Sequence, residues 1–383
     1  MMDIDLKFIF ENFNASGTWI EGSLTGSGHI HSTYLIRTAE QNEPDYILQK
    51  INDKVFPPVA KMMNNIQKVT NHIREKRKSD NSAQVLEIIE TKTKKNYFTD
   101  NQGKHWRMYK KVSPGISYDI VPDKKVASEA GKAFGQFIVD LGDLPAEEIY
   151  PVIPGFHSME MRYENFSKAM NENPFNRVDE VMEEIDFVKD HIDRMMIIPE
   201  LEKTGKLPLR ITHNDTKLNN ILFDHNNRAV CVIDLDTVMP GLSLYDFGDT
   251  IRTAANTGRE DEADLDKVEF SIRIFKAFSE GFLDKTFGFL NKEEIDNLTL
   301  SSQYMTFIMG LRFLTDYISG DVYYTTHYNK QNLRRCRAQF RLMQCMIDSY
   351  NESRKIIRRS VEKLKTGRSA GGSFTQESAG RPD

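Results

Sequence analysis

Two neighbouring stretches near the middle of the chain decide the fold. The first is Ile211-Thr212-His213-Asn214-Asp215-Thr216-Lys217-Leu218-Asn219-Asn220-Ile221-Leu222, and the second is Val232-Ile233-Asp234-Leu235-Asp236. Between them, residues 224–228 are polar and typical of a turn, whereas residues 230–233 are apolar and typical of a strand. We therefore expect a hairpin that returns Asp234 to the side of Asn220.

The residue types in these stretches suit the transfer of a phosphoryl group. Such a site must supply a carboxylate to orient the attacking hydroxyl, ligands for magnesium and cations for the phosphates. Asp215 and Asn220 have the spacing of a kinase catalytic loop, which selects Asn220 over Asn219, and Lys217 is placed to meet the γ-phosphate. A lone loop aspartate is usually a turn or cap residue. The combined spacing favours catalysis for Asp215.

The predicted hairpin also suggests a metal site. Magnesium binds one or two carboxylates together with phosphate oxygens. We expect Asp234 and the amide oxygen of Asn220 to be its ligands, with Asp236 as a possible second carboxylate.

These motifs resemble the catalytic loop and metal-binding strand of the aminoglycoside phosphotransferase superfamily. The resemblance implies the bilobal, protein-kinase-like α+β fold that choline and homoserine kinases share, with a small antiparallel-sheet amino-terminal lobe and a larger helical lobe. It implies ATP and Mg²⁺ as cofactors. It also implies that Asp246 and Asp249 support the catalytic loop by accepting hydrogen bonds from backbone N–H groups.

A wider resemblance, to the N-acetylhexosamine 1-kinases, extends over most of the chain. It is carried by segments 26–30, 46–50, 212–222, 233–241, 246–249, 309–313 and 320–323. The resemblance implies phosphorylation of the anomeric hydroxyl of GlcNAc or GalNAc. It implies acceptor contacts from His31, Arg312 and Tyr323, with Asp215 at the reacting hydroxyl. A sugar pocket needs several fixed hydrogen-bonding groups and an aromatic face, which these residue types can supply.

The amino-terminal part predicts a nucleotide-binding lobe over residues 1–112. Strand patterns at residues 19–24, 33–38 and 46–50 are followed by a helix after Pro58 and by two further strands at 97–99 and 106–112. Residues 113–366 are mostly helical in pattern and form the predicted catalytic and substrate lobe. We expect its helices at residues 124–141, 162–170, 178–196, 265–283, 293–318 and 332–364. Residues 367–383 are rich in Gly, Ser and charge, and we expect them to be disordered.

Four residues in or between the first three strands are candidates for phosphate binding. Gly26, Ser27 and Gly28 form a turn whose backbone N–H groups could approach phosphates, and Lys50 resembles the kinase lysine that pairs with the α- and β-phosphates. The following helix has no acidic residue before Glu75. The partner of Lys50 is therefore open between Glu75, Gln67 and an asparagine.

The strand at residues 106–112 resembles the interlobe hinge that binds adenine through its backbone. The candidate adenine contacts are Tyr109, Lys110 and Val112.

Composition narrows the possible partners. The net charge is −5, with acidic and basic residues interleaved, so we expect no nucleic-acid or membrane partner. Cys231, Cys336 and Cys345 are too few for a disulfide framework and we interpret them as buried thiols of a cytoplasmic protein. The oligomeric state is open. Two alternatives also remain: a kinase of the same fold for an aminoglycoside, choline, homoserine or another sugar, and a nucleotide-binding pseudokinase.

Overall fold

The structure, a computed structural model, describes residues 5–25, 30–56, 58–78 and 84–371, the last five by their backbone alone. The chain divides into two compact units, which we describe separately. The first comprises Met1–Ile120, Phe137–Ser158 and Pro208–Asp246, and the second comprises Val121–Gln136, Met159–Leu207 and Phe247–Asp383. The catalytic segment therefore belongs to the same unit as the amino-terminal sheet. The lobe boundaries expected near residues 112 and 366 stay a prediction.

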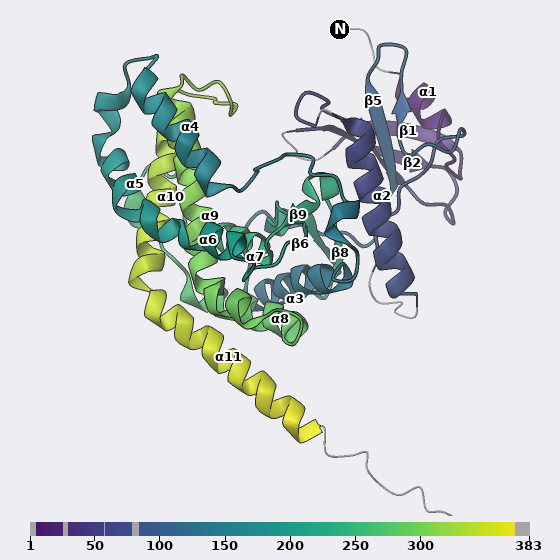
Figure 1. The fold of residues 1–383 in the computed structure, drawn as a ribbon. Coiled ribbons are helices and arrows are strands. Elements are labelled where there is room, and N and C mark those ends of the chain that lie inside the picture. The colour runs from purple at the N-terminus through teal and green to yellow at the C-terminus, as the bar shows by residue number, and fades with distance from the viewer. Residues whose placement is uncertain (1–4, 26–29, 57, 79–83, 372–383) are drawn as a thin grey trace, which may run out of the picture. The chain divides into compact units, whose positions relative to one another are not determined.

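The first unit contains an antiparallel five-stranded sheet in the order β1-β2-β3-β5-β4 (Figure 1). Its strands are β1 (Trp19–Leu24), β2 (Ser32–Thr38), β3 (Tyr46–Lys50), β4 (Phe98–Thr99) and β5 (His105–Lys110). The predicted meander with two added strands is confirmed. A short helix that was not predicted, α1 (Leu6–Glu11), precedes the sheet and is capped by the Asp5 side chain.

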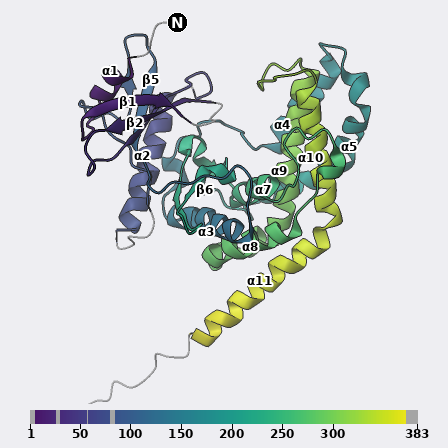
Figure 2. The same ribbon diagram turned by 180° about the vertical axis from the view of Figure 1, so that it is seen from behind.

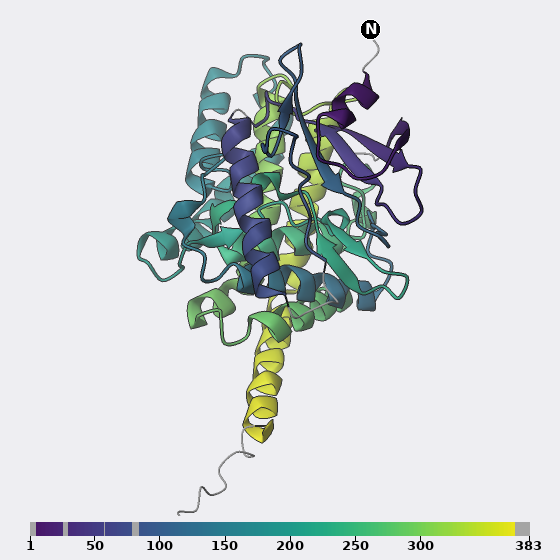
Figure 3. The same ribbon diagram turned by 90° about the vertical axis from the view of Figure 1, so that its right-hand side faces the viewer.

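The two faces of this sheet belong to different hydrophobic clusters. Helix α2 (Val59–Lys76) lies beside the sheet, and its buried residues Met62, Met63 and Ile66 pack in one cluster with Tyr109 of β5 (Figure 3). Trp106 and Met108 of β5 belong instead to a second cluster with Phe10 of α1. Successive side chains of a strand point to opposite faces, so the two clusters divide β5 residue by residue.

Two short sheets hold the catalytic segment. Strand β6 (Arg210–Thr212) pairs with β9 (Met239–Gly241), and β7 (Ile221–Phe223) pairs with β8 (Ala229–Val232). The β7–β8 pair confirms the predicted hairpin. Three short 3₁₀ turns also belong to this unit: η1 (Ala146–Glu148), η3 (Leu218–Asn220) before β7, and η4 (Leu235–Thr237) after β8.

The second unit is helical. Its elements are α3 (Lys124–Asp140, whose end reaches the first unit), α4 (Met159–Glu172), η2 (Val178–Val181), α5 (Met182–Met195), α6 (Ile197–Lys203), α7 (Ser243–Ala254, which begins in the first unit), η5 (Leu265–Lys267), α8 (Ile272–Thr286), α9 (Lys292–Ile318), α10 (Gln331–Asp348) and α11 (Tyr350–Gly371). Helices α9 and α10 lie side by side (Figure 2), and Gly310 permits this because a Cβ there would meet the Phe340 ring at 2.4 Å. With the antiparallel sheet of the first unit, this larger helical part confirms the α+β class.

Several helix boundaries differ from expectation. The helix predicted over 332–364 is divided into α10 and α11 at Ser349, where the chain leaves helical geometry. The break could not be predicted, because no glycine or proline marks it in the sequence. Likewise, the segment expected to be helical from 265 to 283 begins as η5 and becomes α8 only at Ile272. Helices α6 and α7 were not predicted. Helix α11 runs to Gly371, into the segment for which we expected disorder, and residues 372–383 lie outside the described part.

The cysteines and the membrane prediction can be compared directly. Cys231 and Cys336 are buried thiols as predicted, and burial raises the pKa of the Cys231 thiol to about 12. Cys345 is only half-buried, contrary to the expectation for all three. In the part of the chain that the structure describes, no helix combines the length and the apolar character needed to cross a bilayer.

Candidate active site

The catalytic loop begins on a buried carboxylate. The backbone N–H groups of His213 and Asn214 donate to the two oxygens of Asp246, at 2.9 and 2.7 Å, and the Thr216 hydroxyl donates to the Asp246 carbonyl at 2.7 Å. Asp246 is fully buried. The expected support from Asp246 is confirmed, whereas Asp249 pairs with the Arg252 side chain within the second unit instead.

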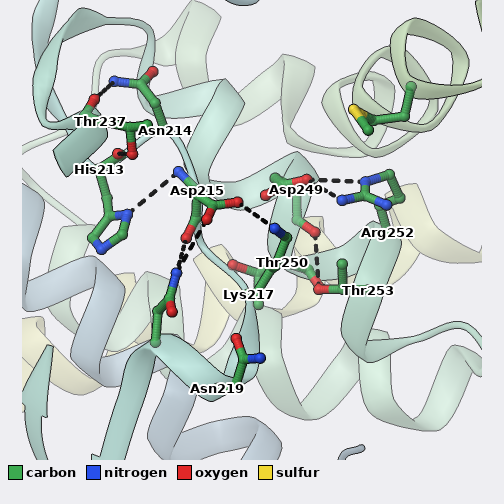
Figure 4. A network of polar contacts seen from close by, with 12 residues as sticks. His213, Asn214, Asp215, Lys217, Asn219, Thr237, Asp249, Thr250, Arg252 and Thr253 are labelled. Carbon is green, nitrogen blue, oxygen red and sulfur yellow. Dashed lines mark hydrogen bonds and ion pairs between the residues drawn. The ribbon is translucent and has the colours of Figure 1, made fainter. Parts of the chain in front are cut away.

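Asn214 sets the direction of the loop before Asp215, the candidate catalytic residue. Its φ of +65° lies in the left-handed region, which asparagine tolerates better than most residues. Its side-chain amide donates to the carbonyls of Thr212 and Thr237, both at 3.1 Å (Figure 4). The strained backbone is therefore fixed on both sides by buried hydrogen bonds.

The Asp215 carboxylate lies between two of the predicted partners. Lys217 Nζ is 2.9 Å from one oxygen, and the Asn220 amide donates to the other at 3.3 Å and to the Asp215 carbonyl at 2.8 Å (Figure 4). The structure thus brings Asp215, Lys217 and Asn220 together. A carboxylate so held is fixed in orientation, as a group that must accept a proton from a bound hydroxyl has to be.

The β7–β8 hairpin returns the chain to this carboxylate. Ile233 donates its backbone N–H to the Asn220 carbonyl at 2.9 Å, and the His213 ring donates from Nε2 to the Ile233 carbonyl at 2.9 Å. The next residue is Asp234, with a φ of +60°. The predicted proximity of Asp234 to the catalytic loop is therefore found at the level of the backbone.

The Asp234 carboxyl is influenced by both neighbouring aspartates. Burial, and then the negative charges of Asp236 and Asp215, raise the pKa of the Asp234 carboxyl to about 6. The Asp234 residue is exposed to solvent, so the charges of Asp236 and Asp215, rather than burial, set the direction of this shift. Such a concentration of negative charge is typical of a cation site.

Asp236 is engaged differently. Arg107 of β5 makes a bidentate contact with its carboxylate: Nη1 contacts one oxygen, and Nη2 donates to the other at 2.9 Å. Arg107 also donates from Nε to Gln49 at 2.9 Å. Both charged side chains are almost completely buried. Burial alone would raise the pKa of Asp236, but Arg107 outweighs it and holds that pKa below its usual range.

His31 is the second partner of Asp236. Its Nδ1 accepts the backbone N–H of Asn52 at 3.0 Å, so its Nε2 must carry the proton that it donates to Asp236. Both nitrogens of His31 are therefore hydrogen-bonded within the first unit, and both oxygens of Asp236 contact Arg107; acceptor binding by His31 and metal binding by Asp236 stay predictions.

Lys50 lies on the other face of the sheet. It pairs in register with Trp106, its Nζ is 5.9 Å from the centre of the Trp106 ring, and its charge acts on Asp100. The structure does not bring Lys50 to the aspartates. Of its candidate partners, Glu75 pairs with Lys78, and Gln67 bonds Asn96 at 3.0 Å.

The candidate nucleotide contacts are only partly described. Gly26, Ser27 and Gly28 lie outside the described residues. Tyr109 is buried beside Arg107, with the guanidinium carbon 5.2 Å from its ring centre, and Val112 packs against the same cluster. The backbone N–H of Lys110 already donates to the Glu87 carbonyl at 3.0 Å, so it is engaged within the protein.

Arg312 and Tyr323 belong to the second unit and lie together there. The Arg312 guanidinium is 5.9 Å from the Tyr323 ring centre and 5.6 Å from that of Tyr324. Asp316 fixes this loop, because its carboxylate accepts the backbone N–H groups of residues 322–324 at 2.8–3.0 Å. A second guanidinium is close by: burial, and then the charge of Arg312, lower the pKa of Arg162 to about 10.

Sequence reasoning missed Arg107, Gln49 and Arg162. Gln49 is adjacent to Lys50, and Arg107 lies on the same strand as Tyr109 and Lys110. Strand alternation separates their faces once the buried face is known. Arg162 has no spacing signal.

Among the described residues, no three His, Cys, Asp or Glu side chains form a group that could hold a metal ion. The predicted set of one amide and one carboxylate still fits Mg²⁺, which usually keeps water and phosphate oxygens as its other ligands.

Comparison with known proteins gives a family match. The model of the phosphotransferase enzyme family matches residues 21–272, which is more than half of the chain. The matched range includes the sheet of the first unit, the catalytic loop and the loop that carries Asp234 and Asp236.

Solved structures with the same fold cover nearly the whole chain. An aminoglycoside phosphotransferase from Alicyclobacillus acidocaldarius has a TM-score of 0.61 at 11% identity, with 95% of this chain and 98% of that chain covered. A microcompartment-associated aminopropanol kinase has a TM-score of 0.55 at 14% identity, with 91% and 97% covered. An amicoumacin kinase in complex with AMP-PNP and Ca²⁺ has a TM-score of 0.54 at 10% identity, with 89% and 94% covered. At these identities the likeness confirms the expected kinase-like fold and nothing finer.

Proposed function

Because the chain belongs to the phosphotransferase enzyme family, we propose that it transfers the γ-phosphoryl group of ATP to the anomeric hydroxyl of an N-acetylhexosamine. The observation that supports this most is the grouping of Asp215, Lys217, Asn220 and Asp234 around one hairpin. These are the groups that phosphoryl transfer needs, in the order and spacing expected from the sequence.

Each of these residues has a proposed role. Asp215 orients the sugar hydroxyl and accepts its proton as the oxygen attacks phosphorus, and Lys217 neutralises charge on the transferred group. Asn220 and Asp234 would hold Mg²⁺, which would offset the negative charge of the phosphates. Lys217 Nζ is 2.9 Å from the Asp215 carboxylate, so it would lie close to the phosphate that the sugar hydroxyl attacks.

The acceptor assignment is supported by charge as well as by resemblance. The proposed acceptor residues Arg312 and Tyr323 stand next to a second guanidinium, Arg162. Two arginines repel the protonated amine of an aminoglycoside, choline-like or aminopropanol-like acceptor, whereas they can donate hydrogen bonds to hydroxyl and acetamido oxygens. This favours an uncharged acceptor rich in oxygen.

Phosphorus NMR tests both acceptor and position of attack. The chain would be incubated with ATP, Mg²⁺ and either GlcNAc or GalNAc, and we expect a sugar 1-phosphate together with ADP. The same assay with aminoglycosides, choline, homoserine and other sugars covers the rival acceptors. Product only from one of these would remove the N-acetylhexosamine assignment. Failure to form ADP with any acceptor would remove the kinase assignment in favour of a pseudokinase.

A further inference from the structure

We propose that Arg107 is a positioning residue for the metal site: it anchors Asp236 to the sheet, so that Asp234 and not Asp236 is presented to the metal. The proposal rests on the proposed function for the presence of a metal–nucleotide complex.

The first step is the position of Arg107 in the sheet. Gln49 and Arg107 are paired in register on β3 and β5, and they share a face with Tyr109, which packs with α2. Lys50 and Trp106 form the neighbouring pair on the opposite face. A cation that leaves β5 toward the loop after β8 must therefore come from position 107, because the alternation of a strand directs position 106 away.

The second step is the geometry of the ion pair. The planar guanidinium contacts both Asp236 oxygens, and Gln49 accepts its remaining Nε–H at 2.9 Å. The Arg107 side chain is 1% exposed and that of Asp236 is 3% exposed. A buried charge pair is tolerated when further hydrogen bonds satisfy its other groups. Here Gln49 and His31 supply them.

The third step connects this pair to the metal ligand. Asp236 lies in the turn η4, two residues after Asp234. The end of this turn is also bonded to α2, because Asn65 donates to the Val238 carbonyl at 3.2 Å. His31 adds a bond to Asp236 from the start of β2. With Asp236 fixed by Arg107 of β5 and by His31, the left-handed turn at Asp234 is anchored two residues further on, which restricts how Asp234 can present its carboxylate.

The test measures metal binding without any acceptor, so it stays separate from the sugar assignment. The affinity for Mn²⁺ in the presence of AMP-PNP would be measured by electron paramagnetic resonance for the wild type and for Arg107→Lys. Lysine keeps the charge but cannot contact both oxygens. We expect a loss of about 10- to 100-fold in Mn²⁺ affinity, the usual effect of removing a partner that orients a metal ligand. Unchanged affinity in the folded variant would overturn the proposal.

A double variant separates positioning from direct binding. If Arg107 acts through Asp236, then Asp236→Asn gives a similar loss, and Arg107→Lys adds little to it. Additive losses would mean that Asp236 binds the metal itself while Arg107 binds phosphate, which contradicts the proposal. The kinetic counterpart is an increased metal requirement with an unchanged KM for the acceptor.

Matched controls come from the same sheet. Arg37 of β2 pairs with Glu21 at 3.5 Å, but both side chains are more than half exposed, and Arg37→Lys should leave Mn²⁺ affinity unchanged. If Arg107→Lys does not fold, Gln49→Ala removes the hydrogen bond that orients the guanidinium, together with the one that Gln49 donates to Thr33 at 3.0 Å, and it should weaken Mn²⁺ binding severalfold. In that case, a Gln49 variant with wild-type Mn²⁺ affinity would count against the proposal. A large loss of Mn²⁺ affinity in Lys50→Met, without a loss in the Arg107 and Gln49 variants, would also count against it.

Discussion

On one face of the five-stranded sheet, β3 and β5 present Gln49 and Arg107 to the loop that carries Asp236. On the opposite face the same two strands present Lys50 and Trp106, next to Asp100 and the cluster that includes α1. Gln49 is next to Lys50 in the sequence and Arg107 is next to Trp106, yet the surroundings of the two faces differ completely. In this sheet, a shift of one residue therefore separates a side chain that contacts the candidate active site from one that packs on the opposite face.

The largest expected effect tests whether the candidate active site, whose Asp236 loop Arg107 contacts, carries out catalysis. Replacing Asp215 with Asn should reduce turnover by about two to four orders of magnitude, because the proton of the attacking hydroxyl loses its acceptor. The rate of ADP release with the best acceptor measures this. Asn219→Ala is the control, since Asn219 is bonded to Asp119 and not to Asp215. Wild-type turnover in Asp215→Asn would remove its catalytic role.

The opposite face should matter for stability but not for ligand binding. Trp106 is 1% exposed and donates from its ring nitrogen to Asp100 at 2.8 Å. Trp106→Ala should lower the free energy of unfolding by about 3–5 kcal/mol, as for other buried aromatic side chains. Urea unfolding gives this value, and calorimetry should show an unchanged affinity for metal and AMP-PNP. A stable variant with weakened nucleotide binding would break the contrast between the two faces.

A smaller loss of stability is expected beneath the catalytic loop. In Asp246→Asn, one of the two backbone donors from His213 and Asn214 would face an amide N–H₂ group instead of an oxygen. The unfolding free energy should fall by about 1.5–3 kcal/mol, the value of a hydrogen bond to a charged group. Turnover should fall as well, because the loop that orients Asp215 is less fixed. Loss of stability with full turnover would show that the loop does not depend on this support.

The smallest effect concerns the attachment of α2. Hydrogen bonds from Lys76, and then from His72, lower the pKa of Asp143 from an ordinary 3.8 to about 2. Since the folded pKa is the lower one, the stabilisation is present above about pH 4 and is lost as the pH falls toward 2. The side chain is 62% exposed, so solvent screens the pair. We expect Asp143→Asn to lower Tm by only about 1–2 °C at pH 6 and low salt.

Calorimetric scans at pH 6 and at lower pH test this sign. The difference between wild type and Asp143→Asn should shrink as the pH falls below 4, and it should also shrink at 1 M salt. A difference that grows with acidity would mean that another group is responsible.

The amino-terminal sheet was predictable because its strands alternate and its turns contain typical residues. Strands β1 and β3 have the predicted bounds, and the remaining three are close to them. Helix α7 was missed because it begins inside the catalytic segment, with Asp246 and Gly248 in its first two turns. Gly248 is required there by close packing: a Cβ would meet the Ser301 carbonyl at 2.3 Å. A sequence shows the glycine but not the neighbour.

The candidate site divides in the same way. Asp215, Lys217, Asn220 and Asp234 are close along the chain, so the hairpin between residues 221 and 232 was enough to predict their grouping. Arg107 and Asp236 are 129 positions apart, and no local pattern connects them. The same limit applied to Lys50, for which strand position alone suggested a role but not the face that its side chain occupies.

The sequence by itself determined which short-range motif could handle a phosphoryl group, because the spacing of Asp215, Asn220 and Asp234 survives in any fold that forms the hairpin. Only the tertiary structure decided that Asp236 is held by Arg107 and His31, and that Lys50 points away from the aspartates. The physical reason is that a local turn fixes the distance between near neighbours, whereas the pairing of distant strands fixes which face of a sheet each side chain occupies.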